Sequence, residues 1–87
     1  MSIRFSRKFK KQHGKAPLKI RKAFYQRLTL FEKDKFSPLL NNHALSGQWR
    51  GYRSINISGD WRAVFIESTR SNLVIFVALG THSQLYG

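Results

Sequence analysis

Residues 72–79 lie in the segment NLVIFVALG, a nearly unbroken apolar run close to the end of an 87-residue chain. Such a run is typical of a strand that is buried on both faces, so other parts of the chain must cover both of its sides. A chain of this length can build one small core of two layers and is too short for a second core. We therefore expect residues 1–87 to form a single domain around a strand at 72–79.

The first residues predict a short strand followed by a basic helix. In SIRFS, Ile3 and Phe5 alternate with polar residues, as in a half-buried strand. Ser6 is suited to cap the N-terminus of a helix formed by RKFKKQH, and Gly14 is placed to end that helix in the left-handed conformation.

A second helix is predicted at about 17–34, where Pro17 suits the first turn. Its apolar residues recur at helical spacing and form one stripe, made of Ile20, Phe24, Leu28 and Phe31. Residues 35–50 contain Pro38 and Gly47 and indicate an irregular crossing segment. Strands at about 51–57 and 60–67 complete the order βααβββ, an α+β domain with two N-terminal helices packed on a mostly antiparallel, four-stranded sheet.

The hairpin GYRSINISGDWRAVF allows two turns. A two-residue turn at Ser58-Gly59 pairs Asn56 with Trp61, whereas a three-residue loop with a left-handed Gly59 pairs Asn56 with Asp60. We favour the second because it separates an apolar face from a polar one. The apolar face then holds Ile55, Trp61, Ala63 and Phe65, and the polar face holds Tyr52, Ser54, Asn56, Asp60 and Arg62. Arg53 falls on the apolar side, with its charged head expected to reach an edge.

The charge balance points to a polyanionic partner. Sixteen Lys and Arg oppose four Asp and Glu, which gives a net charge of +12, and residues 1–35 hold twelve of the basic residues. This density predicts binding to a nucleic acid or an acidic protein. The absence of cysteine excludes disulfides, thiolate zinc sites and thiol nucleophiles. No stretch approaches the ~20 apolar residues of a membrane span, so we expect a cytoplasmic protein with no membrane partner.

Several groups that can bind or transfer protons are expected near strand ends of this one sheet. Asp60 and Arg62 lie two residues apart in the hairpin, His43 precedes it, and GTHSQLYG supplies His82 and Tyr86 directly after the buried strand. An exposed Asp–Arg pair alone would mean little. Their gathering in a strongly basic chain makes them candidates for a site that acts on a polyanion.

The segments HALSGQWRGYRSINISGDWRAVF and ALGTHSQLY resemble the RelE/YafQ superfamily of toxins from type II toxin–antitoxin modules, in particular the RelE/StbE-type mRNA interferases. The resemblance covers nearly the whole chain. It implies an endoribonuclease that cleaves mRNA in the ribosomal A site, without metal, cofactor or small-molecule ligand, through attack of the ribose 2′-OH on the adjacent phosphate. It also implies two macromolecular partners, the ribosome and an acidic antitoxin protein.

The same resemblance assigns roles to individual residues. His43, Asp60 and His82 match the His, Asp and His of the YafQ-like motif, Arg62 resembles the RelE arginine after the hairpin turn, and Tyr86 resembles a base-stacking aromatic residue. His82 is our first choice for proton transfer because an unperturbed histidine titrates near neutrality. Asp60 would act as a base or orient a histidine, and His43 as a second acid or phosphate contact. Further substrate contacts are expected from Asn56, Arg53, Lys8, Lys10, Lys11, Lys19 and Lys22.

The chain departs from the YafQ-like pattern at two positions, with Asn56 in place of a further His and Ala78 in place of an Arg. An Asn cannot transfer protons at neutral pH, so acid–base chemistry falls to the two histidines and Asp60. Two other readings stay open. The fold also carries ParE-type toxins, which inhibit DNA gyrase by binding and cleave nothing, and a basic RNA-binding module without activity would share the charge.

Overall fold

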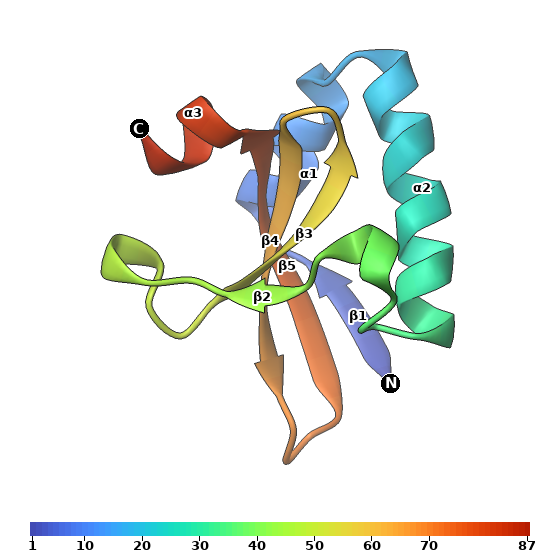
Figure 1. Ribbon diagram of the computed structural model, residues 1–87, viewed down its shortest axis with the longest axis vertical. Helices are drawn as coiled ribbons and strands as arrows, with labels where there is room; N and C mark the ends of the chain where they lie inside the picture. Colours follow the sequence, from blue (N-terminus) through green and yellow to red (C-terminus); the bar gives the residue numbers. More distant parts are fainter.

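The structure is a computed structural model that describes all residues, 1–87. Its strands are β1 (Ser2–Phe5), β2 (His43–Ala44), β3 (Arg53–Ser58), β4 (Trp61–Ser68) and β5 (Leu73–Thr81). Its helices are α1 (Arg7–Lys15), α2 (Leu18–Lys33) and α3 (His82–Tyr86), with short 3₁₀ turns η1 (Pro38–Leu40) and η2 (Gly47–Trp49). The strands form one sheet in the order β1-β5-β4-β3-β2 (Figure 1).

The predicted α+β class is confirmed, with β1 parallel to β5 and every other pair antiparallel. The prediction of four strands is wrong because β2 adds a fifth within the segment expected to be irregular. β2 has two residues, His43 opposite Ser54 and Ala44 opposite Arg53, and a strand this short shows no alternation in sequence. The third helix, α3, was also not predicted.

Ser6 caps α1 as predicted, because its Oγ accepts a hydrogen bond of 3.1 Å from the Phe9 amide. The expected end at Gly14 is wrong, since α1 continues to Lys15 and Ala16 takes an extended conformation. Ala16 precedes Pro17, and the proline ring disfavours the helical conformation in the residue before it. The proline therefore ends α1, and α2 begins directly after it.

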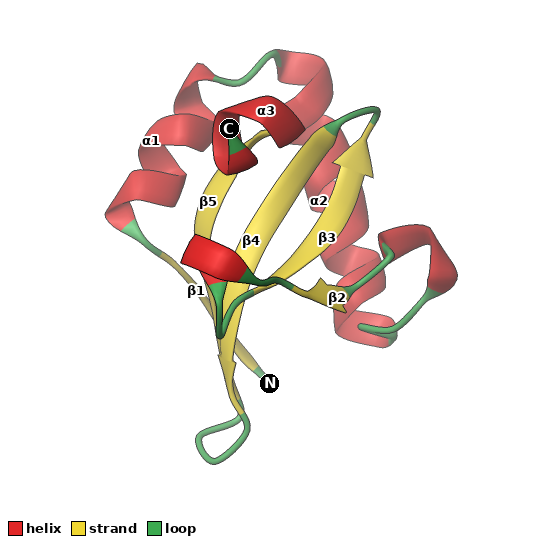
Figure 2. Ribbon diagram, turned by 60° about the vertical axis from the view of Figure 1, so that its left-hand side comes forward, coloured by secondary structure: helices red, strands yellow, loops and turns green.

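The core lies between α1, α2 and one face of the sheet. Ile20, Phe24 and Phe31 of the predicted stripe are buried there, and Leu28 packs against them partly exposed. From the sheet they meet aromatic and aliphatic side chains, among them Phe65 and Phe76. Figure 2 shows α2 behind the sheet and α3 in front of it, so the two faces carry different structures. None of the helices is long and apolar enough to cross a lipid bilayer.

The β3–β4 hairpin uses neither of the two predicted turns. Gly59 and Asp60 form the turn, with Gly59 at φ +56°, and Ser58 lies opposite Trp61. A bulge follows, after which Asn56 lies opposite Arg62. Our register paired Asn56 with Asp60, two residues earlier. Because side chains alternate with a period of two, this slide of two residues keeps the paired strand residues on their predicted faces, whereas Asp60 becomes part of the turn. The apolar face is accordingly buried in the core at Ile55, Ala63 and Phe65.

Candidate active site

A cleft of about 430 Å³ opens on the face of the sheet that α3 covers. It combines side chains from β2, β4, α3 and the segments on either side of β2. The lining residues are Asn41, His43, Leu45, Ser46, Trp49, Arg62, His82 and Tyr86. Four of the five candidate catalytic residues, all except Asp60, therefore come together in this cleft.

His43 is held by the segment that precedes β2. Asn41 adopts a left-handed conformation with φ +46°, and its carbonyl oxygen lies 2.7 Å from Nδ1 of His43. A carbonyl oxygen can only accept a hydrogen bond, so this contact places the proton of the neutral ring on Nδ1. The Nε2 atom of His43 is then left with its lone pair. A histidine oriented in this way can accept a proton.

Arg62 extends from β4 beside Asn56 of β3. Its Nη1 donates hydrogen bonds to the carbonyl oxygens of Gly59 at 2.8 Å and Trp61 at 3.0 Å. These contacts anchor one nitrogen of the guanidinium to the hairpin turn. The other guanidinium nitrogens donate to no protein group and can meet an anion in the cleft.

α3 positions His82 and Tyr86. The helix begins with a capping box in which Thr81 and Gln84 exchange side-chain and backbone hydrogen bonds, and the His82 amide donates to the Asp60 carbonyl at 2.8 Å. The Tyr86 hydroxyl donates to Oγ of Ser54 at 3.0 Å, and Ser54 is fully buried. The rings of His82 and Tyr86 meet edge to face with centroids 4.8 Å apart.

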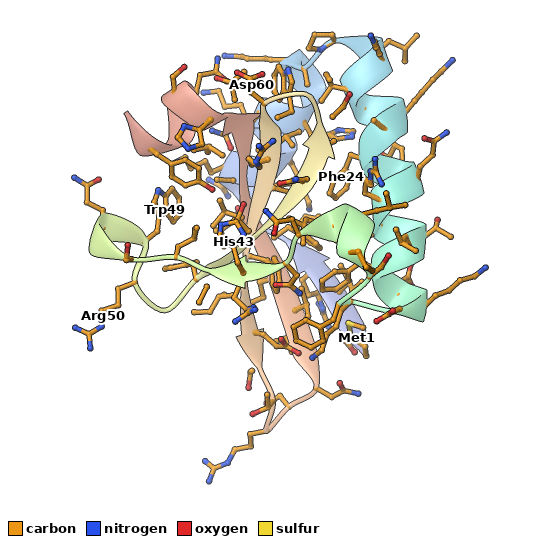
Figure 3. The ribbon with its side chains drawn as sticks, in the orientation of Figure 1. Met1, Phe24, His43, Trp49, Arg50 and Asp60 are labelled. Atoms are coloured by element: carbon orange, nitrogen blue, oxygen red, sulfur yellow. The ribbon has the colours of Figure 1, made fainter.

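Asp60 lies outside the cleft. It is an exposed residue of the β3–β4 turn, and Figure 3 shows it at the tip of the hairpin, above the level of His43. Its carboxylate forms no ion pair with Arg62, so the two residues do not act as the charge pair that their spacing predicted. The contact that Asp60 makes with the site runs through its carbonyl oxygen to His82.

None of the other predicted substrate contacts lines the cleft. Oδ1 of Asn56 is buried without a hydrogen-bond partner beside Arg62. Arg53 reaches the sheet edge as predicted, where Nε donates to Oδ1 of Asn42 at 2.8 Å and the guanidinium lies 5.7 Å from the Phe36 ring centre. Arg53 is thus engaged by the protein itself.

All five candidate lysines are exposed. Lys8 on α1 lies nearest to the cleft, with Nζ 5.9 Å from the centre of the Trp49 ring. Lys19 and Lys22 line a separate cavity on α2. Lys10 and Lys11 extend the basic surface along α1. A single ion pair, Lys35 with Glu67, joins side chains of opposite charge, so most of the positive charge is unneutralised.

The sequence did not lead us to predict Trp49 as a site residue or the capping box of α3. A tryptophan between two glycines in an otherwise polar segment signals an aromatic residue outside the core, and Thr81 followed three residues later by Gln84 is the signature of a capping box. No three His, Cys, Asp or Glu side chains cluster as a metal site would require.

Comparison with known proteins gives one curated relative with a clear match. The chain is 37% identical over 46 residues to the mRNA interferase toxin YafQ of Escherichia coli (strain K12). The aligned part covers 53% of this chain and 48% of that protein, so it spans about half of the relative's length.

Two solved structures share the fold along almost their full length. The crystal structure of YafQ from E. coli strain BL21(DE3) matches with a TM-score of 0.83 and 23% identity over 99% of this chain and 98% of the other. The crystal structure of the E. coli DinJ-YafQ toxin-antitoxin complex matches with a TM-score of 0.80 and 24% identity over 99% and 97%. The sequence model of the YafQ family, bacterial toxins of type II toxin-antitoxin systems, matches residues 1–87, and the chain belongs to this family.

Proposed function

We propose that this toxin is an mRNA interferase, an endoribonuclease that cleaves by attack of the ribose 2′-OH on the neighbouring phosphate. One observation carries the proposal: His43, Arg62 and His82, which come from β2, β4 and α3, line one solvent-open cleft. The reaction needs a base, a cation and an acid at one phosphate, and these three side chains are of the types required.

His43 serves as the base in this proposal. The hydrogen bond from its Nδ1 to the Asn41 carbonyl leaves Nε2 to take the proton from the 2′-OH as the oxygen attacks phosphorus. Arg62 stabilises the charge that gathers on the phosphate oxygens, since two carbonyl contacts hold its guanidinium in place before substrate binds. We therefore assign His43 the role of the base, in place of the predicted role of a second acid or a phosphate contact.

His82 serves as the acid. It gives a proton to the 5′-oxygen as the phosphorus–oxygen bond breaks, so the products are a 2′,3′-cyclic phosphate and a 5′-hydroxyl. Tyr86 packs edge-on against its ring, and the Asp60 carbonyl fixes the first turn of α3. Asp60 then acts as a positioning residue through its backbone. Asn56 lies opposite Arg62 on the adjacent strand, and Arg53 has a structural role.

The basic helices are proposed to hold the ribosome, with mRNA cleaved in the A site. Lys8, Lys10, Lys11, Lys19 and Lys22 are exposed and can bind ribosomal RNA through its phosphates. The same uncompensated charge suits an antitoxin with an acidic segment that folds across the helices or the sheet. The related E. coli toxin is known in a complex with DinJ, which supports a protein partner of this kind.

The test is incubation of the protein with translating ribosomes, followed by mapping of new mRNA ends. We expect cleavage products with 5′-hydroxyl ends, and a decrease of roughly 10²- to 10⁴-fold in cleavage rate for His43→Ala and for His82→Ala. Ser83→Ala is the matched control, because Ser83 is exposed on α3 next to His82 and its side chain makes no hydrogen bond.

Two results would replace the proposal. Intact mRNA together with inhibited supercoiling by DNA gyrase would favour a ParE-like inhibitor. Ribosome binding without cleavage by the wild-type protein would favour a basic RNA-binding module.

A further inference from the structure

A second cavity adjoins the cleft. It measures about 540 Å³ and lies between the β2–β3 loop and α3. Three residues, Ser46, Trp49 and Tyr86, line both spaces. The remaining lining residues of this outer cavity are Gly47, Gln48, Gln84, Leu85 and Gly87. The two cavities therefore share a wall, which places the outer cavity next to an extended ligand bound in the cleft.

Trp49 stands in this shared wall with a fixed orientation. Its indole Nε1 donates a hydrogen bond of 3.0 Å to the Leu85 carbonyl, and the Tyr52 ring meets it edge to face at 5.4 Å. Gly47 at φ +63° and Gly51 at φ +94° give the loop the left-handed turns that bring Trp49 to α3. The ring is only half-buried and takes no part in the hydrophobic core.

The chemistry of the outer cavity fits a nucleotide. A fixed aromatic ring is a surface on which any base can stack. Two glutamines border the cavity, and the amide nitrogen of Gln84 is left to donate because its Oε1 is occupied by the Thr81 amide. Lys8 places its ammonium 5.9 Å from the centre of the Trp49 ring, where it can meet a phosphate. An aromatic platform, amide groups and a cation are together the features of a site for single-stranded RNA.

We propose that the outer cavity is a nucleotide subsite, in which the base next to the scissile dinucleotide stacks on Trp49 while Lys8 contacts its phosphate. The inference rests on the proposed function in one respect, namely that the cleft holds the scissile phosphate. The subsite extends the bound RNA to at least three nucleotides. Its stacking surface accepts every base, so it contributes affinity more than sequence preference.

Tryptophan fluorescence tests the subsite directly, because the chain has two tryptophans and Trp61→Phe leaves Trp49 as the single reporter. The ligands are 2′-O-methyl oligoribonucleotides, which lack the attacking hydroxyl and cannot be cleaved by this route. A dinucleotide is compared with trinucleotides that carry one more nucleotide at the 5′ or the 3′ end. We expect stronger quenching of Trp49 and tighter binding for one of the two trinucleotides. Equal quenching and equal affinity for all three ligands overturn the proposal.

Variants of the wall supply the second measurement, affinity for the preferred trinucleotide by calorimetry. Trp49→Ala should bind about 5- to 150-fold more weakly, the range that stacking of one base contributes. Trp49→Phe cannot donate to the Leu85 carbonyl but keeps a ring, so its affinity should fall less than that of Trp49→Ala. Gln48→Ala changes an exposed residue of the same cavity without touching the core, so it serves as a variant that keeps the fold. Unchanged affinity in Trp49→Ala refutes the subsite, and if that variant does not fold, unchanged affinity in Gln48→Ala refutes it.

The outcomes separate this inference from the proposed function. Quenching by the trinucleotide with no cleavage of unmodified RNA, free or on ribosomes, upholds the subsite and refutes the nuclease. Cleavage without any response of Trp49 upholds the nuclease and refutes the subsite.

Discussion

The hydrogen bond between Tyr86 and Ser54 holds α3 on the sheet, and we expect it to make a measurable contribution to the free energy of unfolding. Ser54 is 0% exposed, and the hydroxyl of Tyr86 is the side-chain group that meets its Oγ, at 3.0 Å. Tyr86→Phe keeps the aromatic ring and removes only this donor. The serine hydroxyl is then left buried without that partner, which costs about 1–3 kcal/mol of folding free energy.

The double variant Ser54→Ala/Tyr86→Phe isolates the interaction energy between the two hydroxyl groups. Removing both partners leaves two apolar groups in contact, so the double variant should be more stable than the sum of the single losses implies, by about 0.5–1.5 kcal/mol. The assay is urea unfolding of the parent, both single variants and the double variant. Thermal unfolding should follow, with the midpoint falling about 4–8 °C per kcal/mol in a domain of this size.

Tyr25→Phe is the control, since the exposed Tyr25 hydroxyl makes no hydrogen bond and its removal should leave stability unchanged. The reasoning is refuted if Tyr86→Phe unfolds at the parental urea concentration, or if the two single losses simply add. Either result would mean that the capping box and the Asp60–His82 contact hold α3 without help from Tyr86.

Three further predictions concern pH, salt and metal ions. Burial, with a smaller contribution from Arg21, lowers the pKa of His13 from its ordinary value of 6.5, so stability is fully present above pH 6.5 and is lost as pH falls toward the folded-state pKa. Urea unfolding between pH 7 and 5 should show this loss, His13→Phe should flatten it, and an unchanged profile would contradict the assignment. Ribosome binding should fall steeply with salt. Reversal of Lys10, Lys19 and Lys22 to Glu should make the log–log slope shallower by about 0.7 for each lysine that binds a phosphate in the parent protein. Arg70→Glu, in the distant β4–β5 turn, should leave that slope unchanged, and equal slopes in all variants would exclude binding through the helices. RNA cleavage should persist in excess EDTA, because the proposed base, acid and cation are side chains, and loss of cleavage that Mg²⁺ restores would require a different mechanism.

Local patterns in the sequence were sufficient for the elements whose formation depends on neighbouring residues. Ser6 caps α1 because the capping contact spans three residues, and the stripe from Ile20 to Phe31 meets the core because helical spacing alone puts these residues on one face. The apolar run at 72–79 became the interior strand β5, between β1 and β4, because apolar strands are favoured where neighbouring elements cover them. Gly14 misled the prediction, because the proline two residues beyond Lys15 decides where α1 ends.

The site depended on contacts that join distant parts of the chain. The resemblance named His43, Arg62, His82 and Tyr86, and the fold brings them to one cleft by pairing the two-residue β2 with β3 and by turning α3 back over the sheet. No local pattern places Trp49 against Leu85 or Tyr86 against Ser54, since these partners are more than thirty residues apart. Asp60 shows the converse, because its spacing from Arg62 suggested a charge pair and the turn directs it elsewhere.

The sequence alone determined the α+β class, the positive charge and the face of the sheet on which the paired residues of the hairpin lie. Alternation with a period of two and a 3.6-residue helical repeat are properties of the backbone, and they hold whatever the rest of the chain does. Only the tertiary structure decided the hairpin register, the fifth strand, the tautomer of His43 and the wall of the outer cavity. Each of these features depends on hydrogen bonds and packing between segments that are distant in the sequence. These contacts form only when the whole sheet forms, so no local stretch of sequence predicts them.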